Sequence, residues 1–145
     1  MSRAPRGGCM IPPTAGPASV RDSMEIALHP ESCLVELRFA PDTTLTGPHG
    51  AAIVEALKSV MGAPGERFGL LADARGVART DADYRAVTGG FFGQHRDVAR
   101  IALINLGPII RVVAEMLRVG IRLQMRTFGD EAAARAWLRA QGIGA

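Results

Sequence analysis

Two short apolar runs constrain the fold of this chain more than any other feature of its sequence. They are Phe68–Asp73 and Arg100–Asn105, each about the length of a strand and polar mainly at its ends. Such a run predicts a strand that is covered on both faces, as in a parallel sheet between layers of helices. Parallel strands need crossover connections, and segments with helical periodicity do follow both runs.

The other elements follow from periodicity and from turn residues. Alternating apolar residues predict a β-hairpin from residue 24 to residue 39, with His29–Ser32 as its turn. Capping residues, prolines and glycines mark the helices, which we expect at residues 46–62, from Thr80 onward, at 108–119 and at 130–141. With a last strand at 123–128, the order is ββαβαβαβα. This order predicts a single α/β domain, a mostly parallel central sheet of about five strands with four helices.

The first residues of the chain differ from the remainder in composition. Residues 1–22 are rich in proline, glycine, alanine and serine and show no periodicity, so we expect a flexible N-terminal arm. The regular pattern begins at Ser23, and residues 23–145 are expected to form the folded domain.

Composition and charge argue against several classes of function. The net charge is only +3 and the arginines are spread over different predicted elements, which argues against a nucleic-acid interface. Two cysteines make neither a disulfide framework nor a metal set, and a reducing cytoplasm is the expected location. The most apolar stretch, Ile101–Ile121, is interrupted by Gly107-Pro108 and carries charges, so no transmembrane segment is expected.

No motif in the sequence specifies a reaction. His29, His49 and His95 are scattered over a turn, a helix start and a helix end, without another ligand at metal-binding spacing. The sequence also lacks a phosphate-binding loop, a nucleophile elbow and a C-x-x-C pair. We therefore expect no catalytic residue, no metal and no cofactor, and we predict that the protein is not an enzyme.

Four segments together resemble a known family. They are LLADARG (70–76), ARIALINL (99–106), GPIIRVVAEMLRVG (107–120) and RTFGDEAAARAWL (126–138). In this order they resemble the SpoIIAA-like domains of the STAS group (sulfate transporters and anti-sigma-factor antagonists), above all their uncharacterised single-domain bacterial members. The resemblance covers about residues 23–141 and implies a STAS-like fold with a regulatory, protein-binding role.

Antagonists of this group are switched by phosphorylation of a serine at the start of the helix that follows the third strand. The corresponding segment here, residues 73–83, lacks their Asp-Ser-Ser-Gly motif, and Thr80 is its only hydroxyl residue. Thr80 with Asp83 is close to a capping box, while Asp81 and Asp83 would repel a phosphate. Helix capping is therefore the favoured interpretation of Thr80.

Asp73 and Arg75 begin the same segment, at the carboxyl end of a predicted parallel strand, where ligands bind open α/β sheets. A loop ion pair or a turn-forming aspartate is the favoured interpretation. Asp73, Arg75, Thr80 and Asp81 together are kept as a candidate switch or ligand loop.

The second predicted helix contains three glycines, Gly89, Gly90 and Gly93. Each costs about 1 kcal/mol relative to alanine inside a helix. Either this helix packs very closely against the sheet, or it is loose enough to move over a pocket. Close packing is the favoured interpretation.

The third predicted helix, residues 108–119, is more apolar than a helix on one side of a sheet needs to be. Its polar residues Arg111, Glu115 and Arg118 line one narrow stripe, and most of the remaining surface is apolar. The excess predicts a second apolar contact, unless neighbouring elements bury the helix all round. The predicted contact residues are Ile109, Ile110, Arg111, Val113, Met116, Leu117 and Arg118.

The sequence thus predicts a cytoplasmic interaction or regulatory module that works through this third helix, either as a homodimer or with another protein. The alternative is binding of an apolar small molecule or lipid in a pocket between the second and third helices.

Overall fold

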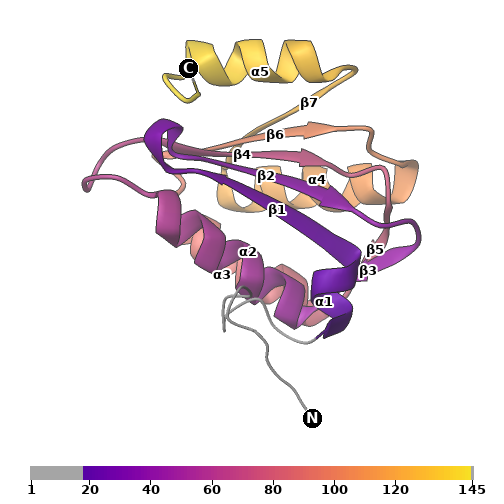
Figure 1. Ribbon diagram of the computed structural model, residues 1–145. Coiled ribbons are helices and arrows are strands. Elements are labelled where there is room, and N and C mark those ends of the chain that lie inside the picture. The colour runs from indigo at the N-terminus through magenta and orange to yellow at the C-terminus, as the bar shows by residue number, and fades with distance from the viewer. Residues whose placement is uncertain (1–17, 145) are drawn as a thin grey trace.

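A five-stranded mixed sheet lies at the centre of the structure, a computed structural model that describes residues 18–144 (Figure 1). Its strands, in sheet order, are β1 (Met24–His29), β2 (Leu34–Phe39), β4 (Phe68–Asp73), β6 (Ala99–Ile104) and β7 (Gln124–Phe128). β1 runs antiparallel to β2, and all other neighbours in this sheet are parallel. The predicted hairpin and the mostly parallel sheet are both confirmed.

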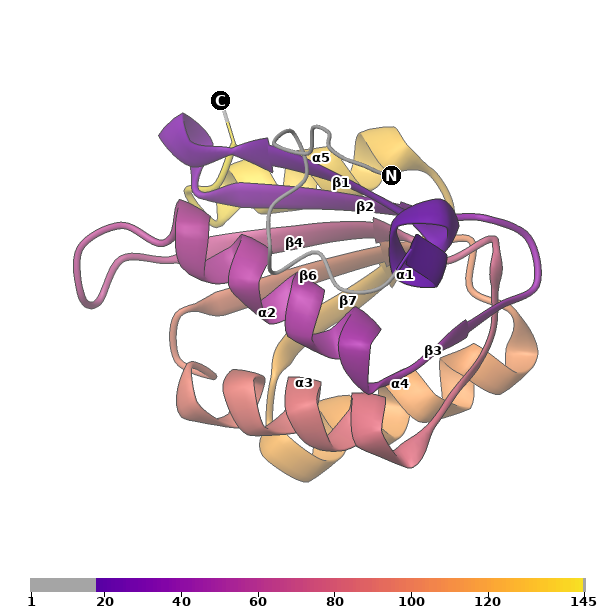
Figure 2. The same cartoon turned by 60° about the horizontal axis from the view of Figure 1, so that its bottom comes forward.

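Helices cover the sheet from both sides, as Figure 1 shows. The lower side in that view carries α2 (Gly47–Val60), α3 (Ala82–Gln94) and α4 (Pro108–Ile121). The upper side carries α5 (Glu131–Ala140). Figure 2 turns the lower layer forward, and α3 and α4 then lie on the β7 side of α2. The predicted α/β fold is confirmed.

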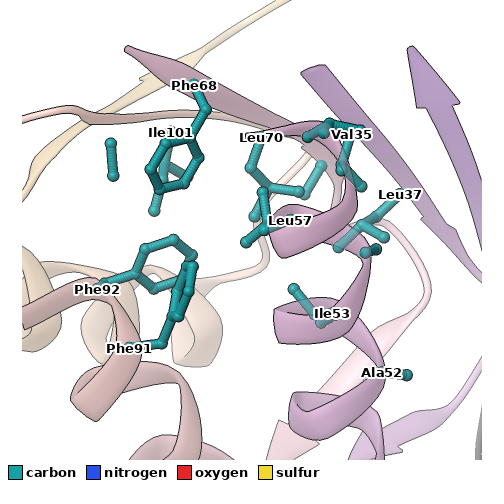
Figure 3. Close-up of a cluster of buried hydrophobic side chains, with 14 of the residues drawn as sticks. Val35, Leu37, Ala52, Ile53, Leu57, Phe68, Leu70, Phe91, Phe92 and Ile101 are labelled. Carbon is teal, nitrogen blue, oxygen red and sulfur yellow. The ribbon is translucent and has the colours of Figure 1, made fainter. Parts of the chain in front are cut away.

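The sheet divides the apolar core into two parts, because successive side chains of a strand point to opposite faces. In the larger part, side chains of β2, β4 and β6 meet those of α2 and the neighbouring Phe91 and Phe92 of α3 (Figure 3). In the smaller part, Leu71 packs with Leu138 of α5. Leu70 belongs to the first cluster and Leu71 to the second, so β4 is covered on both faces as its sequence predicts.

Several short elements were not predicted. α1 (Ala18–Ser23) precedes β1, and its Val20 is buried in the larger cluster. Folded structure therefore begins before residue 23, while the remainder of the predicted arm, residues 1–17, lies outside the described residues. A 3-10 helix, η3 (Pro30–Ser32), forms the hairpin turn. β3 (Thr43–Leu45) and β5 (Val77–Thr80) pair as a separate two-stranded parallel sheet.

The glycines of α3 are not explained by close packing against the sheet. A Cβ atom added to Gly90 or Gly93 would meet no neighbouring atom within 4 Å, and at Gly89 it would make an ordinary contact at 3.7 Å. Tight approaches are made instead by Gly47 and Gly50 of α2, where a Cβ would lie 3.1 Å from Asp83 Cβ and 3.3 Å from the side chain of Val87. The prediction of close α3–sheet packing is wrong, since α3 packs chiefly on α2.

Candidate functional site

α4 is the element on which the predicted function depends. It begins at the Gly107-Pro108 pair, as expected, because proline fits the first turn of a helix. It runs past Gly120 and ends where Arg122 adopts the left-handed region (φ 57°) and donates its N–H to the carbonyl of Arg118. Within the fold it packs mainly on α3 and β5.

The inward side of α4 faces the core. Ile110 and Ala114 are buried, and Val113 and Leu117 are half-buried beside them. Ile110, Val113 and Leu117 were predicted as partner contacts, but these positions point into the domain. The sequence alone could not distinguish these residues from the outward-pointing ones, because apolar residues lie on both sides of α4.

The outward side of α4 carries four large apolar side chains that are between 59% and 68% exposed. We call this set the α4 face: Ile109, Val112, Met116 and Val119. Ile109 and Met116 were among the predicted contact residues, whereas Val112 and Val119 were missed. Their signal was present in the sequence, because the four residues are spaced three, four and three apart, which places them on one side of a helix.

Polar residues border the α4 face along one side. Arg111, Glu115, Arg118 and Arg122 are all exposed. The Arg118 guanidinium donates two hydrogen bonds to the Glu115 carboxylate, which holds the pKa of that carboxyl below its usual range. The guanidiniums of Arg111 and Arg122 have no hydrogen bond or ion pair with any of residues 18–144. The predicted positions of Arg111 and Arg118 on the helix surface agree with the structure.

A cavity of about 90 Å³ lies between α3, α4 and the sheet. Its walls are almost entirely apolar, with Leu70 and Ile101 from the sheet and Val113 and Leu117 from α4. Tyr84 also lines it, and its hydroxyl has no hydrogen-bond partner among residues 18–144. Burial raises the pKa of Tyr84 to about 12. The alternative function, binding of an apolar small molecule or lipid, required a pocket at this place between α3 and α4.

The candidate loop at residues 73–81 is organised by hydrogen bonds within itself. Asp73 Oδ1 accepts from the Arg75 N–H at 3.0 Å and from the Asn105 side-chain amide at 3.1 Å. Asp73 therefore forms a turn and a cross-strand link, without a side-chain ion pair to Arg75. This agrees with the favoured interpretation of a turn-forming aspartate.

Thr80 and Asp81 have different roles from the predicted ones. Thr80 is the last residue of β5 and does not cap α3. Asp81 is the cap, with its carboxylate accepting from the Tyr84 N–H at 2.8 Å. Thr80 Oγ1 instead accepts from the Arg85 guanidinium at 2.9 Å. The predicted Thr80–Asp83 capping box is therefore wrong, because the strand extends through Thr80.

His49 and Ser23 resemble a catalytic pair, with 2.8 Å between His49 Nε2 and Ser23 Oγ. His49 Nδ1, however, accepts the Thr46 N–H at 3.1 Å, so the ring proton of neutral His49 is on Nε2. Nε2 then donates to Ser23 and cannot take its proton, which is the opposite of what a general base does. Burial lowers the pKa of His49 and keeps it in this neutral form. The pair therefore joins α1 to the start of α2.

Two features are absent from residues 18–144. In that range no group of three or more His, Cys, Asp or Glu side chains is placed to hold a metal ion. Likewise, none of the helices there combines the length and apolar character needed to cross a membrane.

Comparison with known proteins places the chain in a family. The model of the SpoIIAA-like family matches residues 37–139. The chain belongs to the SpoIIAA-like family. The resemblance seen in the four sequence segments is confirmed by this match, which begins within β2 and ends within α5.

Several solved structures are similar in fold to the chain. One is an uncharacterized DUF3478-family protein from Shewanella loihica PV-4 with a SpoIIAA-like fold. It aligns with a TM-score of 0.61 and 14% identity over 80% of this chain and 94% of that one. Another is the murine anion transporter Slc26a9 in the inward-facing state, with a TM-score of 0.53 and 14% identity over 75% of this chain but only 18% of the transporter. At such identities the likeness shows the fold alone.

A third structure, the anti-sigma factor antagonist SpoIIAA in its unphosphorylated form, aligns with a TM-score of 0.48 and 16% identity over 83% of this chain and 100% of that one. No curated protein matches the chain.

Proposed function

We propose that this SpoIIAA-like domain is a cytoplasmic, non-enzymatic regulatory module that binds another protein through the α4 face. The observation that carries the proposal is the exposure of four large apolar side chains on one side of one helix. Among residues 18–144, six large apolar side chains are prominently exposed, and four of the six belong to α4. Single exposed apolar residues are ordinary, but a contiguous group of them marks interaction surfaces.

The free energy available from the α4 face is enough to matter. Full burial of a Val, Ile or Met side chain contributes about 1.5–3 kcal/mol. The four side chains are already partly covered, so a partner gains roughly half of this for each, or about 3–6 kcal/mol in total. Association itself has a cost of at least several kcal/mol, so polar contacts around the face must supply the remainder.

A non-enzymatic role is supported by the arrangement of the polar side chains. His49 has the wrong tautomer to activate Ser23, and the cavity beneath α4 contains Tyr84 among apolar side chains. The family match adds to this, since regulatory protein binding is what a SpoIIAA-like fold suggests.

The proposal is tested by replacing Met116 with a photo-crosslinking amino acid in the producing cells. We expect one protein adduct that is lost when Val112→Glu is added, because a carboxylate in the middle of the face opposes apolar contact. As a matched control, Ala132→Glu on exposed α5 should leave the adduct unchanged. An adduct that survives Val112→Glu, or no adduct at residue 116, contradicts the proposal.

A second candidate function is binding of a small apolar ligand in the cavity between α3, α4 and the sheet. The hydroxyl of Tyr84 supports it, because this group lines the cavity without a hydrogen-bond partner among residues 18–144 and can donate to a ligand acceptor atom. At about 90 Å³ the cavity is smaller than the engineered cavity of about 150 Å³ that binds benzene. A lipid chain therefore does not fit this conformation.

Native mass spectrometry of gently purified protein tests this second function. A constant added mass of a small apolar compound, lost in Ala114→Val because the larger side chain fills the cavity, would support it. Repeatedly unmodified mass would rule it out.

A further inference from the structure

We propose that the partner of the α4 face is an acidic amphipathic helix of another protein, and that a second copy of this chain is not its partner. This inference rests on the proposed function and concerns the chemistry of the partner.

The spacing of the α4 face fits a helical partner. Ile109, Val112, Met116 and Val119 repeat at intervals of three, four and three residues, which is the a and d pattern of helices that pair side by side. Three of the four side chains are β-branched, and such side chains have few rotamers to lose when they interlock with a facing helix. The α4 face therefore has the residue pattern of one helix in a pair of helices that pack side by side.

The charges beside the face favour an acidic partner. Glu115 is neutralised by Arg118, whereas the exposed guanidiniums of Arg111 and Arg122 have no partner among residues 18–144. Along this border Arg111, Arg118 and Arg122 stand against one glutamate, Glu115, which leaves a net charge of +2. A helix with carboxylates beside its apolar stripe would complete these ion pairs.

A second copy does not supply those carboxylates. Each copy would bring Arg111, Arg118, Arg122 and Glu115 to the contact, so a symmetric pair would place six arginines against two glutamates. Like charges opposed across an interface weaken it and suppress that pairing. The same arginines that attract an acidic helix therefore oppose self-association.

A lipid surface fits the face less well. Helices that lie on membranes place Trp, Phe or Leu on the apolar side, and the α4 face has no aromatic residue. Glu115 lies near the middle of the polar border, where it would meet anionic headgroups.

In the test, a variant of this chain with acidic residues beside the α4 face serves as the partner. In Arg111→Glu/Arg122→Glu, the apolar stripe and the Glu115–Arg118 pair remain, while the border changes from net positive to net negative. Sedimentation velocity is measured for the wild type, for this double variant, and for their equimolar mixture at low salt. We expect each protein alone to be monomeric and the mixture to contain a heterodimer.

Raising the salt from about 50 mM to about 500 mM should weaken this heterodimer about tenfold or more, because exposed charges are screened.

Two controls separate charge at the α4 face from charge in general. Arg96→Glu/Arg139→Glu changes the net charge equally at exposed positions outside α4, and it should form no complex with the wild type. Adding Met116→Glu to the wild type should abolish the heterodimer.

The remaining outcomes overturn the inference in distinguishable ways. A wild-type dimer that Met116→Glu dissociates would make the second copy the partner, and would overturn both this inference and the binding of another protein through the α4 face. Binding of the wild type to phosphatidylglycerol vesicles, without a heterodimer, would make lipid the partner and overturn both. The absence of a heterodimer, together with an intact crosslinked adduct at residue 116, would show a protein partner of different chemistry.

Discussion

Met116 and Leu117 are neighbours in sequence but lie on different sides of α4, and alanine substitutions separate their roles. Leu117 is half-buried and already borders the 90 Å³ cavity, whereas the Met116 side chain is 68% exposed. Truncation of a fully buried leucine costs about 2–5 kcal/mol. For the half-buried Leu117 the lower end applies, so Leu117→Ala should reduce the free energy of unfolding by about 2 kcal/mol. Met116→Ala should change it by no more than about 0.5 kcal/mol.

Urea unfolding followed by tryptophan fluorescence measures both changes. Trp137 is the single tryptophan of the chain, and it lies on α5, on the other side of the sheet from α4. Its ring centroid is 5.8 Å from that of Phe128, so its signal reports the loss of the whole fold and not of α4 alone. In thermal unfolding, 2 kcal/mol corresponds to a fall in Tm of roughly 6 °C for a domain of this size. Equal destabilisation by the two substitutions would refute the orientation of α4 on which the proposed function depends.

Three further predictions concern the scaffold. Gly90→Ala should raise the free energy of unfolding by up to about 1 kcal/mol in urea titrations, because the added methyl group meets open space in a helix. A lower free energy of unfolding would show that another part of the protein packs against this position. His49 has a pKa below 6.5 in the folded state, so its stabilising contribution is complete above 6.5 and declines as the pH falls below that value. The free energy of unfolding should therefore fall more steeply between pH 7.5 and 5 in the wild type than in His49→Gln, and equal slopes would contradict this. Arg135 holds the pKa of Glu36 below 4.5, and Arg135→Gln should cost about 1–2 kcal/mol at neutral pH. This cost should shrink as the pH falls below 4.5, because the wild type then loses the contribution of ionised Glu36; a constant difference would contradict the assignment.

The order of the main strands along the chain and their mostly parallel direction could be predicted from the sequence, because each strand has a pattern of its own. β4 and β6 are apolar on both faces, β1 and β2 alternate, and Asp130 marks the start of α5 by accepting the Ala133 N–H. The small β3–β5 sheet was missed for a physical reason. Strands of three and four residues show no periodicity, and their pairing joins segments that are far apart in the chain.

The site was only partly predictable. The excess of apolar residues on α4 is visible in the sequence, but Ile110 and Met116 look alike there and differ only in what lies opposite them in the fold. The role of Thr80 was missed because the unpredicted strand β5 extends through it and leaves the cap to Asp81. The glycines of α3 suggested close packing against the sheet, yet the tight contacts are made by Gly47 and Gly50 of α2, where the sequence gives no sign of them.

The central claim, that the α4 face binds a protein, is tested most directly by an affinity. Once the protein crosslinked at residue 116 is identified and purified, isothermal titration calorimetry can compare its binding to the wild type, to Met116→Glu and to Ala132→Glu. We predict that Met116→Glu weakens binding at least about tenfold, the loss of one central contact, and that Ala132→Glu leaves it unchanged. Equal affinity of the wild type and Met116→Glu, with both proteins fully folded, would contradict the proposed function.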